Sequence, residues 1–167
     1  MTFAVLSIGS NIGDRRAHLE GVIDALGTRL VARSRIYETP PWGGVEQEPF
    51  LNAILLAEAA DWAPADWLDL AQQCEQAAER VRDIRWGPRT LDVDIIACHD
   101  ARGEIRSDDP RLTLPHPRAH ERAFVLVPWA EVQRGATLAG ISLTDLLDRL
   151  PDAEVQAVRP LAPPTGW

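Results

Sequence analysis

The stretch that decides the fold is Thr90-Leu91-Asp92-Val93-Asp94-Ile95-Ile96-Ala97. Its apolar and β-branched residues predict a strand. Side chains two residues apart in a strand point to the same face, so Asp92 and Asp94 project together, while Leu91, Val93 and Ile95 pack the other way. This strand closes a series of six predicted elements, and the five before it indicate how it is placed.

Upstream, an apolar run over residues 3–8 predicts a buried first strand that stops at Gly9. A helix is expected from about Asp14 to Gly27, a second strand over 31–38, a loop over 39–49 and a third strand over 50–58. A second helix is expected to begin at Pro64 and to present one apolar face as far as Val81.

The order strand–helix–strand–strand–helix–strand predicts an α+β fold of the ferredoxin-like βαββαβ type. In this sandwich, an antiparallel sheet of four strands carries both helices on one face. The remaining residues predict a C-terminal extension, with a helical stretch after Pro117 and a short helix over 143–150 that ends at Pro151. We expect a single domain over residues 1–167.

The composition excludes several classes of enzyme. The chain has 17 basic and 25 acidic residues, for a net charge of −8, and every basic residue is arginine. A Walker-type phosphate loop, a protein kinase and a Schiff-base enzyme each need a lysine. The acidic balance also argues against a nucleic-acid partner. Phosphate handling is therefore expected from arginines, metal ions and backbone amides.

The sequence also indicates where the protein works. The N-terminus lacks a signal-peptide pattern, and no stretch approaches the roughly 20 apolar residues of a membrane span. Cys74 and Cys98 have neither disulfide-framework nor zinc-site spacing. We expect a cytoplasmic protein without a membrane partner, and a monomer, since no large apolar helix face stands out.

Asp92 and Asp94 are the strongest candidate for chemistry. Two carboxylates held together repel each other unless a cation or a proton separates them. Hard oxygen ligands on a strand suit Mg²⁺, which takes one or two carboxylates and completes its shell with water and phosphate oxygens. The alternative is the polar outer face of an edge strand.

An arginine-rich segment lies just before this strand. Arg80, Arg82, Arg85 and Arg89 fall within ten residues, and the planar guanidinium binds phosphate oxygens in bidentate fashion. Arginines with Mg²⁺ are typical of phosphoryl transfer; the alternative is a set of surface salt bridges. Trp86, within this segment, could stack on a base or pin the loop to the core.

Several motifs, taken in order, resemble the 6-hydroxymethyl-7,8-dihydropterin pyrophosphokinase family of the folate pathway. They comprise Gly9-Ser10-Asn11-Ile12-Gly13-Asp14, Thr39-Pro40-Pro41, Phe50-Leu51-Asn52, the run from Arg85 to Ile95, and Pro115-His116-Pro117 with Arg122 and Phe124. The resemblance spans residues 3 to about 130. It implies transfer of pyrophosphate from ATP to the hydroxymethyl group of the pterin, with release of AMP.

The resemblance also implies roles for individual residues. The metal ligands would be Asp92 and Asp94, which would hold two Mg²⁺ ions. The residues neutralising the phosphates would be Arg80, Arg82 and Arg89. The ATP site would be lined by Gln72, Glu75, Arg82, Trp86, Ile95, Thr113, His116 and Arg122. The pterin would contact Phe50, Phe124, Asn52, Asp92 and the segment Thr39, Pro40, Pro41, Trp42 and Gly43.

Two other functions remain open from the residues alone. One is a Mg²⁺-dependent phospho- or nucleotidyl-transferase that acts on a different acceptor. The other is a ferredoxin-like module that stacks RNA bases on its sheet, against which the net charge of −8 counts.

Overall fold

The computed structural model describes residues 1–40, 48–80, 90–162 and 167. Its centre is an antiparallel sheet in which β1 (Thr2–Ser10) lies between β4 (Phe50–Ala59) and β5 (Asp92–Asp100). The strands outside this trio are β2 (Leu30–Arg33) and β3 (Tyr37–Thr39), which both pair with β4, then β11 (Arg159–Pro160) beside β3, and β6 (Gly103–Glu104) beside β5.

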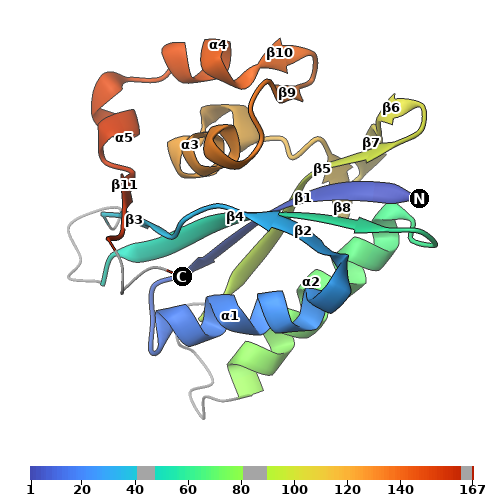
Figure 1. Cartoon of the computed structure of the whole chain (residues 1–167), viewed down its shortest axis with the longest axis horizontal. Coiled ribbons are helices and arrows are strands. Elements are labelled where there is room, and N and C mark those ends of the chain that lie inside the picture. The colour runs from blue at the N-terminus through green and yellow to red at the C-terminus, as the bar shows by residue number, and fades with distance from the viewer. Residues whose placement is uncertain (41–47, 81–89, 163–166) are drawn as a thin grey trace.

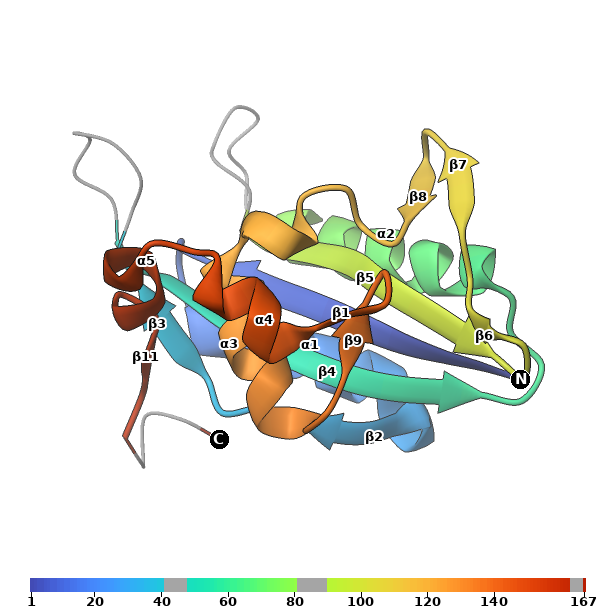
Figure 2. The same ribbon diagram turned by 90° about the horizontal axis from the view of Figure 1, so that it is seen from above.

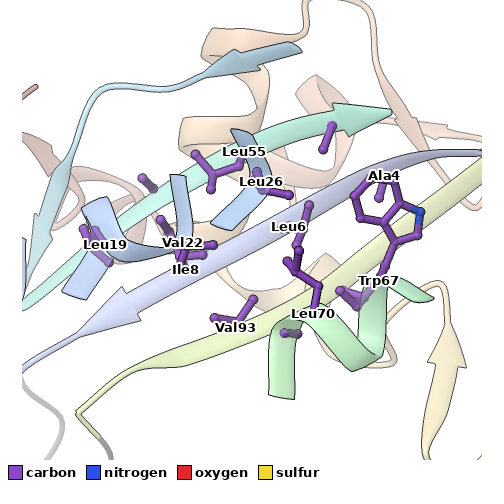
Figure 3. Packing of buried hydrophobic residues seen from close by; sticks show 14 of the residues in the cluster. Ala4, Leu6, Ile8, Leu19, Val22, Leu26, Leu55, Trp67, Leu70 and Val93 are labelled. Atoms are coloured by element: carbon purple, nitrogen blue, oxygen red, sulfur yellow. The ribbon is translucent and has the colours of Figure 1, made fainter. Parts of the chain in front are cut away.

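Two helices cover one face of the sheet, as the sequence predicts. They are α1 (Arg15–Leu26) and α2 (Pro64–Arg80), which lie below the sheet in Figure 1. Figure 3 shows Leu26 of α1 and Trp67 of α2 on either side of Leu6 of β1, and Leu19 of α1 nearer to Ile8 of β1. The even-numbered apolar residues of β1 thus supply the core of this layer.

The C-terminal third of the chain covers the opposite face. Figures 1 and 2 show α3 (Ala123–Val132), α4 (Leu143–Asp148) and α5 (Asp152–Gln156) on the side of the sheet away from α1 and α2. Val125 and Trp129 of α3 pack against Val5 of β1 and Ile54 of β4. Because β1 is buried on both faces, its sequence is a continuous apolar run and not an alternating one.

The remaining elements are short. They are η1 (Gly27–Arg29), η2 (Ala119–Glu121) and two hairpins, β7 (Ser107–Asp109) with β8 (Leu112–Leu114) and β9 (Thr137–Leu138) with β10 (Ile141–Ser142). In the part of the chain that the structure describes, no helix has the length and apolar character needed to cross a membrane.

The second predicted strand, over residues 31–38, is wrong as one continuous element. The structure divides it into β2 and β3, with a break over residues 34–36. At the break, the Ser34 hydroxyl accepts a hydrogen bond from the Ile54 backbone N–H at 2.9 Å, in place of a ladder carbonyl. A side chain that replaces a backbone acceptor interrupts the strand pairing.

Candidate active site

A cavity of about 750 Å³ opens where the C-terminal end of β1 meets the N-terminal ends of β4 and β5. Four adjacent strands form its floor, with the side chains or backbone of Ser7, Gly9, Thr39, Phe50, Asn52, Asp92 and Asp94. Its walls come from α3 and the segment before it and from α5 and the segment before it, with Arg118, Glu121, Arg122, Phe124, Leu150, Pro151 and Glu154.

Strand register brings the floor residues together. Gly9 of β1 lies opposite Asn52 of β4 on one side and Asp92 of β5 on the other. Two residues earlier in β1, Ser7 lies opposite Asp94. Asn52, Gly9 and Asp92 therefore form one row across the sheet, with an amide at one end and a carboxylate at the other, although Asn52 and Asp92 are 40 positions apart in the sequence.

Asp92 and Asp94 both line the cavity from the same face of β5, as their spacing predicts. An oxygen of Asp94 lies 3.7 Å from a guanidinium nitrogen of Arg122, and the Asp94 side chain keeps 41% of its surface exposed. Within residues 1–40, 48–80 and 90–162, no cluster of three or more acidic, histidine or cysteine ligands occurs. An accessible pair of carboxylates fits Mg²⁺, which fills its remaining positions with water and phosphate oxygens.

His116 and Arg118 join the walls to β5. The backbone N–H of His116 donates to the Ile96 carbonyl at 2.8 Å, and the backbone N–H of Arg118 donates to His116 Nδ1 at 3.1 Å. Burial lowers the pKa of His116, and Arg122 and Arg118 add to this, whereas Asp94 raises it. The lowered pKa favours the neutral imidazole, and because Nδ1 accepts a hydrogen bond, the neutral ring carries its proton on Nε2, where it can donate to an acceptor.

The opposite end of the cavity carries an amide and two aromatic rings. Asn52 is buried, and its Nδ2 donates to Thr39 Oγ1 at 3.0 Å. Phe50 and Phe124 line the same space, and the guanidinium carbon of Arg122 lies 5.6 Å from the Phe124 ring centre. This end combines flat apolar surfaces with a fixed donor and acceptor, a combination suited to an aromatic heterocycle.

Other predicted site residues lie away from this cavity. Gln72 and Glu75 lie on α2, and Ile95 is buried against α1 and α2. Thr113 lies on β8, where its hydroxyl donates to the Asp109 carbonyl at 3.1 Å. Pro40 lines an adjoining cavity of about 380 Å³ that shares Thr39, Arg122 and Phe124 with the larger one. Pro41, Trp42, Gly43, Arg82, Arg85, Trp86, Arg89 and the Arg80 side chain lie outside the described residues.

The chain matches the model of the 7,8-dihydro-6-hydroxymethylpterin-pyrophosphokinase (HPPK) family over residues 5–134. This chain belongs to the HPPK family. It is 52% identical over 172 residues to a 2-amino-4-hydroxy-6-hydroxymethyldihydropteridine pyrophosphokinase of Mycobacterium tuberculosis strain H37Rv, a match that covers 98% of this chain and 92% of the relative. A relative of the same name from Methylorubrum extorquens is 41% identical over 162 residues, covering 95% of this chain and 99% of the relative.

Solved structures of HPPK-DHPS share the fold. A crystal structure of Plasmodium falciparum HPPK-DHPS wild type aligns with a TM-score of 0.64 at 14% sequence identity, over 89% of this chain. The HPPK chain described here spans 41% of that solved chain. This likeness shows that the chain shares with these structures a mixed architecture of an antiparallel sheet and helices.

Sequence reasoning missed several residues of this HPPK cavity. Ser7 and Gly9 carried a detectable signal, because they are a hydroxyl and a glycine within an otherwise apolar buried strand. The remaining missed residues are Arg118, Glu121, Leu150, Pro151 and Glu154. They belong to irregular or short segments whose position over the sheet depends on tertiary packing and not on local periodicity.

Proposed function

We propose that this HPPK-family chain transfers pyrophosphate from ATP to the hydroxymethyl group of 6-hydroxymethyl-7,8-dihydropterin in a Mg²⁺-dependent reaction that releases AMP in folate biosynthesis. The observation that carries the proposal is the joint occurrence, in one cavity, of a carboxylate pair and of an amide flanked by aromatic rings. One end suits a metal-bound polyphosphate, and the other suits a flat heterocycle. The names of the relatives support the pterin as substrate and the transfer of pyrophosphate.

The proposed pterin site lies at the aromatic end. Phe50 and Phe124 would stack on the heterocycle, which gains from contact with aromatic faces. Asn52 would satisfy its donor and acceptor edge. Thr39, Pro40, Pro41, Trp42 and Gly43 would complete this site.

The proposed phosphate site lies at the carboxylate end, where Asp92 and Asp94 would hold two Mg²⁺ ions. Bound Mg²⁺ neutralises charge on the triphosphate and lowers the barrier to attack at phosphorus. Arg122 lines the same cavity and adds a fixed positive charge that supports ATP binding there. The further ATP residues of the proposal are Gln72, Glu75, Arg82, Trp86, Ile95, Thr113 and His116.

The reaction itself needs positioning more than covalent catalysis. The hydroxymethyl oxygen attacks the β-phosphorus and releases its proton, and the bond from that phosphorus to the α–β bridging oxygen breaks, so that AMP leaves with that oxygen. The chain would hold the two substrates at opposite ends of one cavity, which converts an encounter between molecules into a reaction within one complex. Arg80, Arg82 and Arg89 would neutralise the phosphates as they separate.

The proposal extends to the organisation of the protein. The strand order β3–β4–β1–β5, with antiparallel pairing and with α1 and α2 on one face, supports a ferredoxin-like core within a single domain. We take the working form to be a cytoplasmic monomer without a nucleic-acid partner, because the reaction needs only ATP, Mg²⁺ and a small pterin.

The test is to incubate the protein with ATP, Mg²⁺ and hydroxymethyl-dihydropterin and to separate the nucleotides and pterins. We expect AMP and a pterin diphosphate in equal amounts, and neither product after chelation of the metal or omission of the pterin. Formation of ADP in place of AMP, or AMP release that does not need the pterin, would contradict the proposal.

A further inference from the structure

The backbone conformation of β1 does not explain why residue 9 is a glycine. Glycine weakens the interior of a strand, because it has no side chain to pack and loses more conformational entropy on folding than other residues. The glycines with positive φ among the described residues are Gly13, Gly27, Gly103, Gly135 and Gly140, so the left-handed conformation is not the reason at residue 9. A glycine in a strand otherwise marks a close approach by another group.

The approaching group is the Asn52 side chain. A Cβ atom built on Gly9 would lie 2.7 Å from Asn52 Oδ1, closer than such atoms come in folded proteins. The nearest backbone atom, the Leu51 carbonyl oxygen, would lie at an ordinary 3.6 Å. The added methyl group would therefore collide with the end of a side chain, which can rotate, and not with the strand.

The Asn52 carboxamide is held from two sides. Its Nδ2 donates to Thr39 Oγ1 at 3.0 Å, and its Oδ1 occupies the space left by the missing side chain at Gly9. Asn52 keeps only 4% of its surface exposed, so the plane of the amide has little freedom. The second Nδ2 hydrogen and the free lone pairs of Oδ1 are thereby fixed in direction.

We propose that Gly9 is a positioning residue for pterin recognition, because its missing side chain keeps the Asn52 carboxamide in the orientation that pairs with the donor and acceptor edge of the pterin. This inference rests on the proposed function. An added methyl group at residue 9 would turn the amide away from that edge while leaving the sheet and the carboxylate pair in place.

The test compares Gly9→Ala with the wild-type chain in steady-state kinetics and in pterin titrations with Mg²⁺ and a non-hydrolysable ATP analogue. We expect the dissociation constant for the pterin to rise about tenfold or more, while the KM for ATP changes by less than about twofold, since a site built to hydrogen-bond a group discriminates strongly when the pairing is lost. Gly21→Ala, within α1, is the matched control: apart from the neighbouring residues and backbone of its own helix, no atom lies within 4 Å of its added Cβ, so pterin binding should not change.

A double-mutant cycle separates this mechanism from a general disturbance of β1. Asn52→Ala removes the atom with which the new methyl group collides, so adding Gly9→Ala to it should weaken pterin binding by less than about twofold. Losses that add fully would overturn the inference, because they would place the effect on Asp92 or on the strand itself. Loss of the folded state in Gly9→Ala, with a folded double variant, would also overturn it, because the space at Gly9 would then serve the fold and not the orientation of the amide toward the pterin.

Different results would contradict the proposed function and the proposed role of Gly9. A wild-type chain that binds no pterin removes the proposed function, and the inference with it. A wild-type chain that binds the pterin, together with a Gly9→Ala variant that binds it equally well, removes the inference alone.

Discussion

The Asp94 carboxylate serves the cavity more than it serves the fold. Its side chain is 41% exposed, and it forms an ion pair with Arg122 at 3.7 Å, which is of the exposed kind that contributes about 0 to 1 kcal/mol. We predict that Asp94→Ala lowers the rate of AMP formation at least about 100-fold, equivalent to about 2.7 kcal/mol of transition-state stabilisation. Urea unfolding should show a loss of stability below about 1 kcal/mol.

Asp108→Ala is a suitable control for that variant, because it removes an equal charge from an exposed position on the β7–β8 hairpin. Asp108→Ala should change neither the rate of AMP formation nor the stability in urea. Near-normal AMP formation by Asp94→Ala would show that the carboxylate pair is not a metal site.

The two cysteines differ in their chemical environment. Burial raises the pKa of the Cys98 thiol to about 12. Burial, helped by the negative charge of Glu75, also raises the pKa of the half-buried Cys74 thiol. Because the thiolate is the reactive form, the Cys98 thiol stays protonated and inert through pH 8.

We therefore predict that iodoacetamide at pH 8 modifies Cys74 before Cys98 in the folded protein, and that Cys98 reacts only after urea is added. Peptide mass spectrometry reads the order directly. A Cys74→Ser variant should incorporate no label under native conditions, and rapid labelling of that variant would refute the buried, protonated state of Cys98.

At the scale of elements, α1 depends on its cap. Asp14 precedes the helix, and its carboxylate accepts a hydrogen bond from the Ala17 backbone N–H at 3.1 Å. We predict that Asp14→Ala costs about 1 kcal/mol in urea unfolding. Asp24→Ala, an exposed change of equal charge within α1, should cost nothing, since alanine has the higher helix propensity. Equal effects of the two changes would point to charge and not to capping.

The elements with strong periodicity and clear end signals were predictable from the sequence. The Asp14 cap and Gly27 set the bounds of α1, and the alternation of Asp92 and Asp94 with apolar residues defined the cavity face of β5. The break at Ser34 was not predictable, because it depends on a hydrogen bond to Ile54, twenty residues away. Local patterns do not contain such partners.

The candidate site likewise contains residues that local sequence patterns predict and residues that they do not. Its floor could be predicted in part, because the period of two in a strand places Asp92 and Asp94 on one face, whereas Phe50 and Asn52 were expected there only from the resemblance to the family. Leu150, Pro151 and Glu154 could not be placed, since nothing local shows that α5 and the segment before it return over the sheet. The role of Gly9 likewise needs the strand register that brings it against Asn52.

On the scale of the whole molecule, the sheet separates two cores that each hold one fully buried tryptophan. Trp67 lies in the layer of α1 and α2, and Trp129 lies in the layer of α3. Both are 0% exposed, and the indole N–H of each donates at 2.8 Å to one side chain, Thr2 for Trp67 and Gln133 for Trp129. They form a matched pair for testing which layer shapes the cavity.

We predict that Trp67→Leu and Trp129→Leu each lower the free energy of unfolding by about 2 to 4 kcal/mol, because each leaves a cavity in a closed core. Only Trp129→Leu should also raise the KM for the pterin, because α3 carries Phe124 and has Arg122 as its N-cap residue. Urea unfolding and steady-state kinetics measure the two effects. Equal changes in KM would show that the layers are not independent supports of the site.

The parts of the cavity are also ordered in time during synthesis. The described floor residues all lie between Ser7 and Asp94, whereas the described wall residues lie between Arg118 and Glu154. A nascent chain that has left the ribosome only as far as β5 therefore holds its carboxylates and amide on an open surface. The cavity is enclosed only when the segment from Arg118 to Glu154 has been made and has folded back over the sheet.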